Sequence, residues 1–258
     1  MSEKRQGVQS VVTAMHLLHS LAAIGRPATL SELAAAAGLA PAKAHRYLVS
    51  LIEGGMVEQG ARAESYKFGP AAISIGIAAL RQNDFAALAR PRINAIRDRA
   101  NVSCFAAVFG NKGPTVIQQA EAAQSVSVHV RPGSVLPLAR SATGRAFAAW
   151  LPEETLAPFL KDEGVAAKEM EEHLDAVRRT GLAIIRDTLL PGISAVAAPV
   201  FDRFDGALLG VFTALGPSGS IDVAADGPVA TTIRAVIEEM GALLIPQAEA
   251  PAEARKGS

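Results

Sequence analysis

The chain has 258 residues, half of them apolar, and its 25 lysines and arginines balance 25 aspartates and glutamates. A net charge of zero excludes the strongly basic composition of a protein that coats nucleic acid without specificity, so any DNA binding must come from a local arrangement of charges. A chain of this length can bury one large core and still form a smaller second domain, so two domains are expected.

Charge and cysteine content narrow the class of protein further. The first 67 residues hold seven lysines and arginines against five glutamates, a net charge of +2, which leaves −2 for the remainder. The single cysteine, Cys104, excludes an intramolecular disulfide and suits a reducing compartment. The polar segment 1–7 lacks the apolar core of a secretion signal, and no run approaches the roughly 18 apolar residues of a membrane-spanning helix. A cytoplasmic location is expected.

A first helix is predicted from Val8 to Ala23, where apolar residues recur with a helical period before Gly25 and Pro27. Its predicted inward face consists of Val11, Val12, Met15, Leu18, Leu21 and Ala22. Its predicted polar face consists of Ser10, Thr13, His16 and Ser20.

A capping signal marks the start of the next helix. Thr29 stands three residues before Glu32, the spacing of a reciprocal capping box. The alanine-rich segment that follows is predicted to be a short helix that ends at Gly38.

A third helix and two strands are predicted to follow. Pro41 occupies a position where the first helical turn tolerates proline, and the helix is predicted to run to about Glu53. Segments 56–59 and 65–68 have the composition of short strands around a polar loop. Three short helices and a hairpin are the layout of a winged helix-turn-helix domain.

Gly69 and Pro70 mark a boundary, after which the apolar segment 71–80 is predicted to form a helix that links two domains. The expected division is a small domain over residues 1–69, a linker helix over 70–83, a larger domain over 84–246 and a disordered tail over 247–258.

The larger domain is predicted to contain strands, then helices, then strands again, enclosed by two helices. Helices are predicted over 85–100, 143–151, 153–160, 168–180 and 223–244, and strands over 103–109, 115–121, 126–130, 183–187, 194–201 and 207–214. This order predicts an α+β fold with helices packed on a mostly antiparallel sheet.

The third helix carries different residue types on its two faces. Its predicted inward stripe consists of Ala44, Leu48, Leu51 and Ile52, and its outward stripe of Ala42, Lys43, Arg46, Tyr47 and Ser50. Arg46 can make a bidentate contact to guanine, and its neighbours suit phosphates or base edges. Four further residues are predicted to reach the flanking DNA backbone: Arg5, Gln9, Arg62 and Lys67. A solvated polar face and a surface for protein contacts are the alternatives.

The residues as a whole resemble one family over nearly all of 8–245. Leu30–Ala34, Gly38–Leu39, His45–Leu48, Leu51, Gly54–Val57 and Tyr66–Gly69 are similar to the N-terminal domain of the IclR family of regulators. Leu136–Ala146, Gly181–Ala183, Pro191–Ile193 and Ala197–Asp202 are similar to the loop, helix start and later strands of its C-terminal domain.

This resemblance implies the identity of both domains and of their partners. The small domain would bind double-stranded, near-palindromic operator DNA, and the larger would be a GAF-like α/β domain for effector binding and oligomerisation. A homodimer or dimer of dimers would control a catabolic operon, as a repressor or an activator. RNA polymerase remains an open partner, and no membrane contact is expected.

The start of the helix predicted after Arg140 suits a carboxylate ligand, because free backbone N–H groups and the positive dipole end lie there. Ala142 and Gly144 are small enough to let that backbone approach a ligand closely. An ordinary capped helix without a ligand is the alternative. The resemblance implies effector contacts from Ala142, Thr143, Ile185, Ala195, Thr213 and Leu215.

Two departures from the family pattern bear on the effector. Ile185–Arg186 and Thr188 stand where many relatives carry acidic residues. A less acidic, more apolar pocket favours an aromatic or medium-chain carboxylic acid.

No catalytic residue, metal site or cofactor is predicted. Cys104 has no nearby histidine in sequence and no helix N-terminus to lower the pKa of its thiol, so a buried, inert thiol is expected. Nucleophile-elbow, phosphate-loop, dinucleotide and zinc-protease motifs are all absent, and the five histidines lack metal-ligand spacing. The remaining alternatives are an enzyme with an appended winged domain and an assembly factor that uses this domain for protein contacts.

Overall fold

The computed structural model describes residues 8–60, 65–81, 84–122 and 130–242. The chain divides into two compact units, Met1–Gln82 and Asn83–Ser258. Within the described residues, no helix combines the length and the apolar character needed to cross a membrane.

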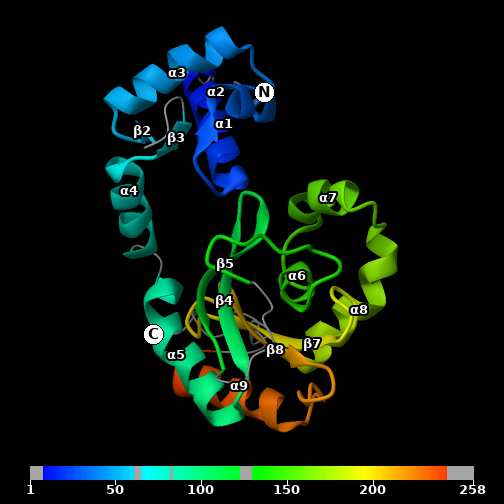
Figure 1. Ribbon diagram of the computed structural model, residues 1–258. Helices are drawn as coiled ribbons and strands as arrows, with labels where there is room; N and C mark the ends of the chain where they lie inside the picture. Colours follow the sequence, from blue (N-terminus) through cyan, green and yellow to red (C-terminus); the bar gives the residue numbers. More distant parts are fainter. Residues whose placement is uncertain (1–7, 61–64, 82–83, 123–129, 243–258) are drawn as a thin grey trace, which may run out of the picture. The chain divides into compact units, whose positions relative to one another are not determined.

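The first unit is a winged helix-turn-helix, as predicted (Figure 1). Its helices are α1 (Gln9–Ile24), α2 (Leu30–Ala36), α3 (Pro41–Glu53) and α4 (Pro70–Arg81). Its antiparallel sheet has the order β1-β3-β2, with β1 at Ala28–Thr29, β2 at Val57–Gln59 and β3 at Ser65–Phe68. The two-residue strand β1 was not predicted, because a segment this short has no period to detect.

The prediction for the faces of α1 is wrong for five residues. Val11, Val12, Met15 and Ala22 are exposed, whereas Thr13 is buried and donates its hydroxyl to the carbonyl of Gln9 (2.9 Å). Ile52 of α3, also predicted to point inward, is exposed. Hydropathy alone does not distinguish an apolar face that packs on its own core from one that is left uncovered.

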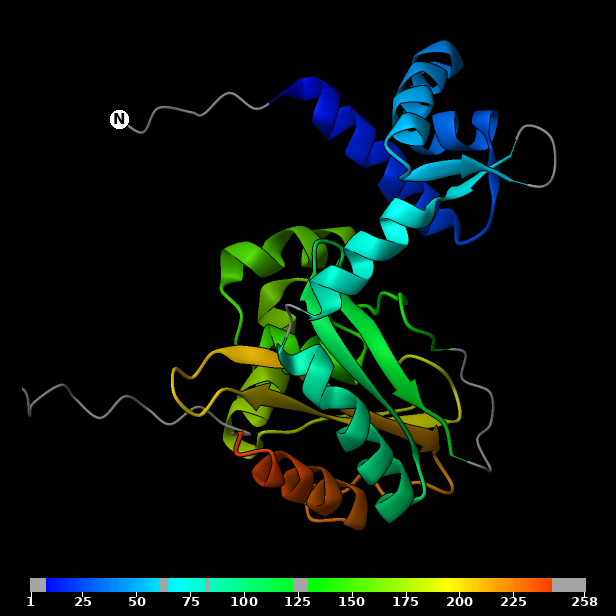
Figure 2. The same ribbon diagram turned by 90° about the vertical axis from the view of Figure 1, so that its left-hand side faces the viewer.

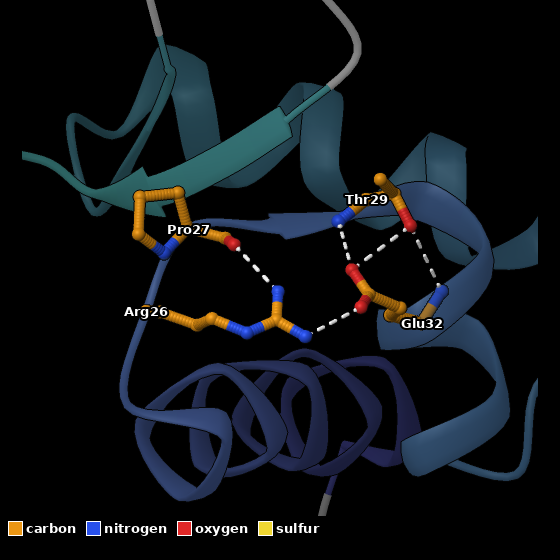
Figure 3. Close-up of polar contacts among 4 residues, drawn as sticks. All are labelled: Arg26, Pro27, Thr29 and Glu32. Carbon is orange, nitrogen blue, oxygen red and sulfur yellow. Dashed lines mark hydrogen bonds and ion pairs between the residues drawn. The ribbon is translucent and has the colours of Figure 1, made fainter. Parts of the chain in front are cut away.

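The capping box predicted at the start of α2 is present (Figure 3). The Thr29 hydroxyl accepts the Glu32 N–H (3.3 Å), and the Glu32 carboxylate accepts the Thr29 N–H (2.8 Å). Arg26 donates to the same carboxylate (2.7 Å) and to the carbonyl of Pro27 (3.1 Å). The bond from Arg26, followed by those from Thr29, lowers the pKa of Glu32 to about 2. The capping box and the ion pair therefore depend on one ionised side chain.

The second unit is a three-layer α+β fold built on a five-stranded antiparallel sheet of order β5-β4-β8-β7-β6. Helices α5 and α9 cover one face, and α6, α7 and α8 lie on the other (Figures 1 and 2). The strands are β4 (Ser103–Gly110), β5 (Gly113–Ala120), β6 (Ala183–Arg186), β7 (Ile193–Phe201) and β8 (Leu208–Pro217). The helices are α5 (Asp84–Ala100), α6 (Ala142–Ala148), α7 (Glu153–Asp162), α8 (Ala167–Thr180) and α9 (Pro228–Glu239).

Both faces of this sheet are buried because helices cover both, and successive side chains of a strand therefore enter different cores. On β4, Cys104 and Ala106 belong to the core shared with α5 and α9, whereas Phe105 and Ala107 belong to the core shared with α6. The second of these cores contains the candidate pocket.

One helix of this unit begins later than predicted. The predicted start was Val223, but α9 begins at Pro228 after a turn in which Asp222 accepts the N–H of Ala224 (2.9 Å). Proline at the first helical position fixes this start. Most of the strand predicted over 126–130, and the predicted tail, lie outside the described residues.

Candidate nucleic-acid interface and effector pocket

A tight turn joins α2 to α3. Gly38 adopts φ +65°, a left-handed conformation that glycine reaches without steric cost, and the N–H of Leu39 donates to the carbonyl of Ala34 (2.9 Å). Beyond the turn, Ala44 and Leu48 are buried and fix α3 against the core of its unit. The opposite side of α3 therefore faces outward from this unit.

Most of the α3 residues predicted to contact DNA are exposed: Ala42, Lys43, Arg46 and Ser50. Tyr47 differs, because it is half-buried and packs on the core. No ion pair joins Lys43 or Arg46 to any described residue. Two cations on one helix face are thus available to phosphates or base edges.

The residues predicted outside α3 are less uniform. Gln9 begins α1 and is exposed. Lys67 is exposed on β3 but is paired with Glu58 of β2 (Nζ to Oε1, 2.7 Å). An exposed pair of this kind is worth about 0–1 kcal/mol, so Lys67 can exchange the carboxylate for a phosphate at little cost. Arg5 and Arg62 lie outside the described residues.

His45 and Val49 are among the exposed residues of α3 that sequence reasoning did not include in the DNA-binding face. The signal was present in the spacing, because Val49 lies three residues after Arg46 and seven after Ala42. Hydropathy alone favours a core position for valine, although Val49 is not part of the described core.

A pocket lies between the sheet and α6, with about 460 Å³ of empty space that includes solvent at its open side. It brings together six of the residues predicted for the effector: Ala142, Thr143, Ile185, Ala195, Thr213 and Leu215. Sequence reasoning missed seven others: Phe105, Val130, Leu136, Ser141, Leu189, Leu190 and Ile193. Several of these come from loops, whose approach to the pocket has no periodic signal in the sequence.

The described lining of this pocket contains no charged side chain. Its three hydroxyl groups already have partners: Thr143 and Thr213 share a hydrogen bond (2.9 Å), and Ser141 donates to the carbonyl of Pro137 (2.6 Å). An apolar body therefore suits most of the wall, and any polar end of a ligand must meet these hydroxyls or backbone groups.

The start of α6 offers such backbone groups. Ser141 caps the helix by accepting the N–H of Gly144 (2.8 Å). The N–H groups of Ala142 and Thr143 have no hydrogen bond to a described residue, and both residues line the pocket, whose accessible surface is almost wholly apolar. Gly144, predicted as a contact, does not line the pocket; its missing β-carbon instead leaves room for the carbonyl oxygens of Pro137 and Leu138.

Two charged side chains hold the loop that precedes α6. The Glu163 carboxylate accepts the N–H groups of Leu138 (2.5 Å) and Ala139 (3.0 Å). The guanidinium of Arg145 donates through Nε to the carbonyl of Ala139 (2.8 Å), and partial burial lowers the pKa of Arg145. The loop is thereby fixed against α6, which positions the free N–H groups of the pocket.

The thiol of Cys104 and the described metal-ligating residue types lie apart from these sites' chemistry. Cys104 is buried on β4, and burial raises the pKa of its thiol, so the prediction of a buried thiol is confirmed. The described histidines, cysteines and acidic residues form no group of three that could hold a metal ion.

Comparisons with known proteins agree with both units. A family model described as "Bacterial transcriptional regulator IclR C-terminal" matches residues 77–216, and one described as "IclR helix-turn-helix domain" matches 10–61. The Transcriptional repressor IclR of Escherichia coli is 25% identical, over 94% of this chain and 88% of its own length. Curated relatives are named as transcriptional repressors rather than enzymes.

Two solved structures are similar over most of this chain. The crystal structure of Pseudomonas aeruginosa HmgR is 38% identical, with a TM-score of 0.57, and the match covers 91% of this chain and 98% of HmgR. An IclR homolog from Microbacterium hydrocarbonoxydans, solved in complex with 4-hydroxybenzoate, is 17% identical with a TM-score of 0.71, over 90% and 99% of the two chains.

Proposed function

Because this chain belongs to the IclR family of bacterial transcriptional regulators, we propose that it binds an operator through α3 and that a carboxylic acid with an apolar body controls this binding. The observation that carries the proposal is that one chain has both an outward cationic face on α3 and an apolar pocket beside the start of α6.

The case for DNA rests on Lys43 and Arg46. Both are exposed on the helix that follows the tight turn, and neither is paired with a described residue. The planar guanidinium of Arg46 matches the two acceptors of guanine in the major groove, whereas Lys43 suits a phosphate. Gln9 and Lys67, together with Arg5 and Arg62, are proposed to contact the backbone beside the groove.

A homodimer on a near-palindromic operator is proposed from two uncovered apolar helix faces. Val11 and Val12 of α1, and Ile73 and Ile77 of α4, are exposed, Ile73 by 61%. A second copy of the chain is the proposed partner, because a twofold axis would pair identical faces and present two recognition helices to two half-sites. Ile73→Glu with Ile77→Glu is expected to give a monomer in sedimentation; a dimer that persists in this variant would contradict the assignment.

The case for an apolar carboxylate rests on the pocket wall. Its described lining is aliphatic and aromatic apart from three hydroxyls that already have partners. The free N–H groups of Ala142 and Thr143, at the start of α6, are the proposed donors to a carboxylate. The Microbacterium homolog, solved in complex with 4-hydroxybenzoate, is a precedent for an aromatic carboxylate in this fold.

Control is proposed to work through unequal affinity for two arrangements of the dimer. An effector that binds one arrangement of the effector domains more tightly raises the population of that arrangement. Because α4 connects the DNA-binding domain to the effector domain along the chain, the change is proposed to reach α3. A catabolic operon is the proposed target. Repression or activation depends on where the operator lies relative to the promoter.

The DNA-binding role is tested with Arg46→Ala in a gel shift against DNA from upstream of the gene itself. Loss of one bidentate guanine contact is expected to weaken binding roughly 5- to 150-fold. Arg179→Ala, which removes an exposed arginine from α8, is the matched control and is expected to bind as the wild type does. An unchanged shift for Arg46→Ala would contradict the role of α3.

The effector class is tested by calorimetry with benzoate, 4-hydroxybenzoate, octanoate, glyoxylate and pyruvate. The apolar wall predicts binding of the first three acids. Tight binding of glyoxylate or pyruvate without binding of the larger acids would contradict the proposed class. Affinity for the acids is expected to be the same in Arg46→Ala, because α3 belongs to the other unit.

A protein-contact role for the winged domain is the second candidate. It is distinguished by salt, because DNA affinity falls steeply with salt as phosphate contacts release counterions. A gel shift that is absent at low salt would favour protein contacts.

A further inference from the structure

Three residues form a stripe along the outward side of α3. Ala42, Arg46 and Val49 are spaced at i, i+4 and i+7, so they lie one above the other on the same side of the helix. All three are exposed, and Val49 exposes 42% of its surface. The residue that follows Arg46 in this stripe is therefore apolar.

Packing within its own unit does not explain Val49. The described core of this unit includes Ala44 and Leu48 from α3, with Tyr47 and Leu51 at its edge, but not Val49. A β-branched side chain also lowers helix propensity relative to alanine, so the residue does not serve helix formation.

The polar residues of α3 lie on either side of this stripe. Lys43 and Ser50 are exposed on one side and His45 on the other. In a major groove, such flanks would meet the two sugar–phosphate backbones while the stripe faces the base edges. Glu53, the last residue of α3, is also exposed and continues the stripe one turn beyond Val49, where the helix ends.

The major groove offers one apolar group on its base edges, the 5-methyl of thymine. We infer that Val49 contacts the 5-methyl group of a thymine and is a specificity-determining residue of the operator contact. This inference rests on the proposed function. The position of Val49 relative to Arg46 gives the geometry. Three residues of helix rise about 4.5 Å, so the thymine lies within about two base pairs of the guanine contacted by Arg46.

Uracil tests this inference because it differs from thymine only by the methyl group. The full-length protein selects an operator from random duplex DNA, and the guanine read by Arg46 is the position whose preference disappears in Arg46→Ala. Each thymine of one half-site is then replaced by deoxyuridine, and affinity is measured by fluorescence anisotropy. Replacement of one thymine within two base pairs of that guanine is expected to lower the affinity of the protein for the duplex about fourfold, which is the effect of losing one buried methyl group.

A double-mutant cycle, in which the replacement of thymine by uracil is combined with a substitution in α3, assigns this loss of affinity to a side chain. Val49→Ala is expected to bind the thymine and uracil duplexes equally, whereas Ser50→Ala, which removes a polar group from the same helix, is expected to retain the fourfold difference. A full thymine preference in Val49→Ala, or no sensitive thymine near the guanine, would overturn the inference. If Arg46→Ala still reduces affinity in that case, the proposed DNA-binding role of α3 holds and only the inference about Val49 fails. If Arg46→Ala has no effect, both the role of α3 and the inference fail.

Discussion

Gly144→Ala is expected to destabilise the second unit and weaken its pocket. A β-carbon at this position would overlap the carbonyl oxygens of Pro137 and Leu138 and lie 2.6 Å from the carbonyl carbon of Leu138. These are backbone atoms, so the overlap is relieved only if the loop moves. Glu163 and Arg145 oppose that movement through hydrogen bonds to the loop.

The expected loss follows from two opposing effects. Overpacking a well-packed site costs about 1–3 kcal/mol, and replacing glycine by alanine in a helix returns up to about 1 kcal/mol. Because backbone atoms lie close to the added β-carbon on two sides, the cost of overpacking is expected at the upper end of its range. The free energy of unfolding is therefore expected to fall by about 1–2 kcal/mol. For a unit of this size, that lowers the unfolding temperature by roughly 2–8 °C.

Fluorescence of Trp150 measures the effect, because it is the only tryptophan of the chain and packs edge-to-face on Phe201 in the second unit (ring centroids 5.1 Å apart). Gly219→Ala is the matched control, since nothing lies within 4 Å of its added β-carbon. Benzoate affinity is also expected to fall in Gly144→Ala, because the N–H groups of Ala142 and Thr143 move with the loop. An unfolding temperature equal to that of the wild type would refute the reasoning.

Three further predictions concern other buried or paired groups. Arg26 and the capping box depress the pKa of Glu32 to about 2 from an ordinary 4.5, so their stabilisation is present above pH 4.5 and is lost as the pH falls towards 2. The stability difference between wild type and Glu32→Gln, measured by urea unfolding followed by circular dichroism, should shrink over that range; a constant difference would contradict this. Cys104 should resist a thiol reagent at pH 8 in the native protein and react after unfolding; rapid native labelling would mean that the thiol is accessible. Thr213→Val leaves the buried Thr143 hydroxyl unpaired and should cost about 1–3 kcal/mol in urea unfolding, and addition of Thr143→Val should recover part of that cost; additive losses would contradict the pairing.

The sequence predicted best those parts of the fold that local chemistry determines. The bounds of α3 follow from Pro41 and the glycines after Glu53, and the start of α2 follows from the Thr29–Glu32 spacing. The apolar runs that form β4 and β7 were likewise predicted as strands, the first of them from the hairpin turn that follows it at 111–113.

Six pocket residues from distant segments were predicted through the family resemblance, but several other features that depend on such contacts were not. The exposed Val11 and Met15 resemble core residues in the sequence, since hydropathy does not report which face has a partner. The pocket residues Leu189 and Leu190 lie in a loop after β6, where no periodicity indicates the direction of a side chain. The role of Gly144 depends on the carbonyl oxygens of Pro137 and Leu138, whose approach leaves no pattern in the sequence.

The most direct measurement is the affinity of the full chain for its operator with and without a saturating acid from the calorimetry panel. Linkage between the pocket and α3 predicts a change of roughly 5- to 150-fold, and the operator should change the affinity for the acid by the same factor. An acid that binds in calorimetry yet leaves operator affinity unchanged at every concentration would contradict the coupling of the two sites.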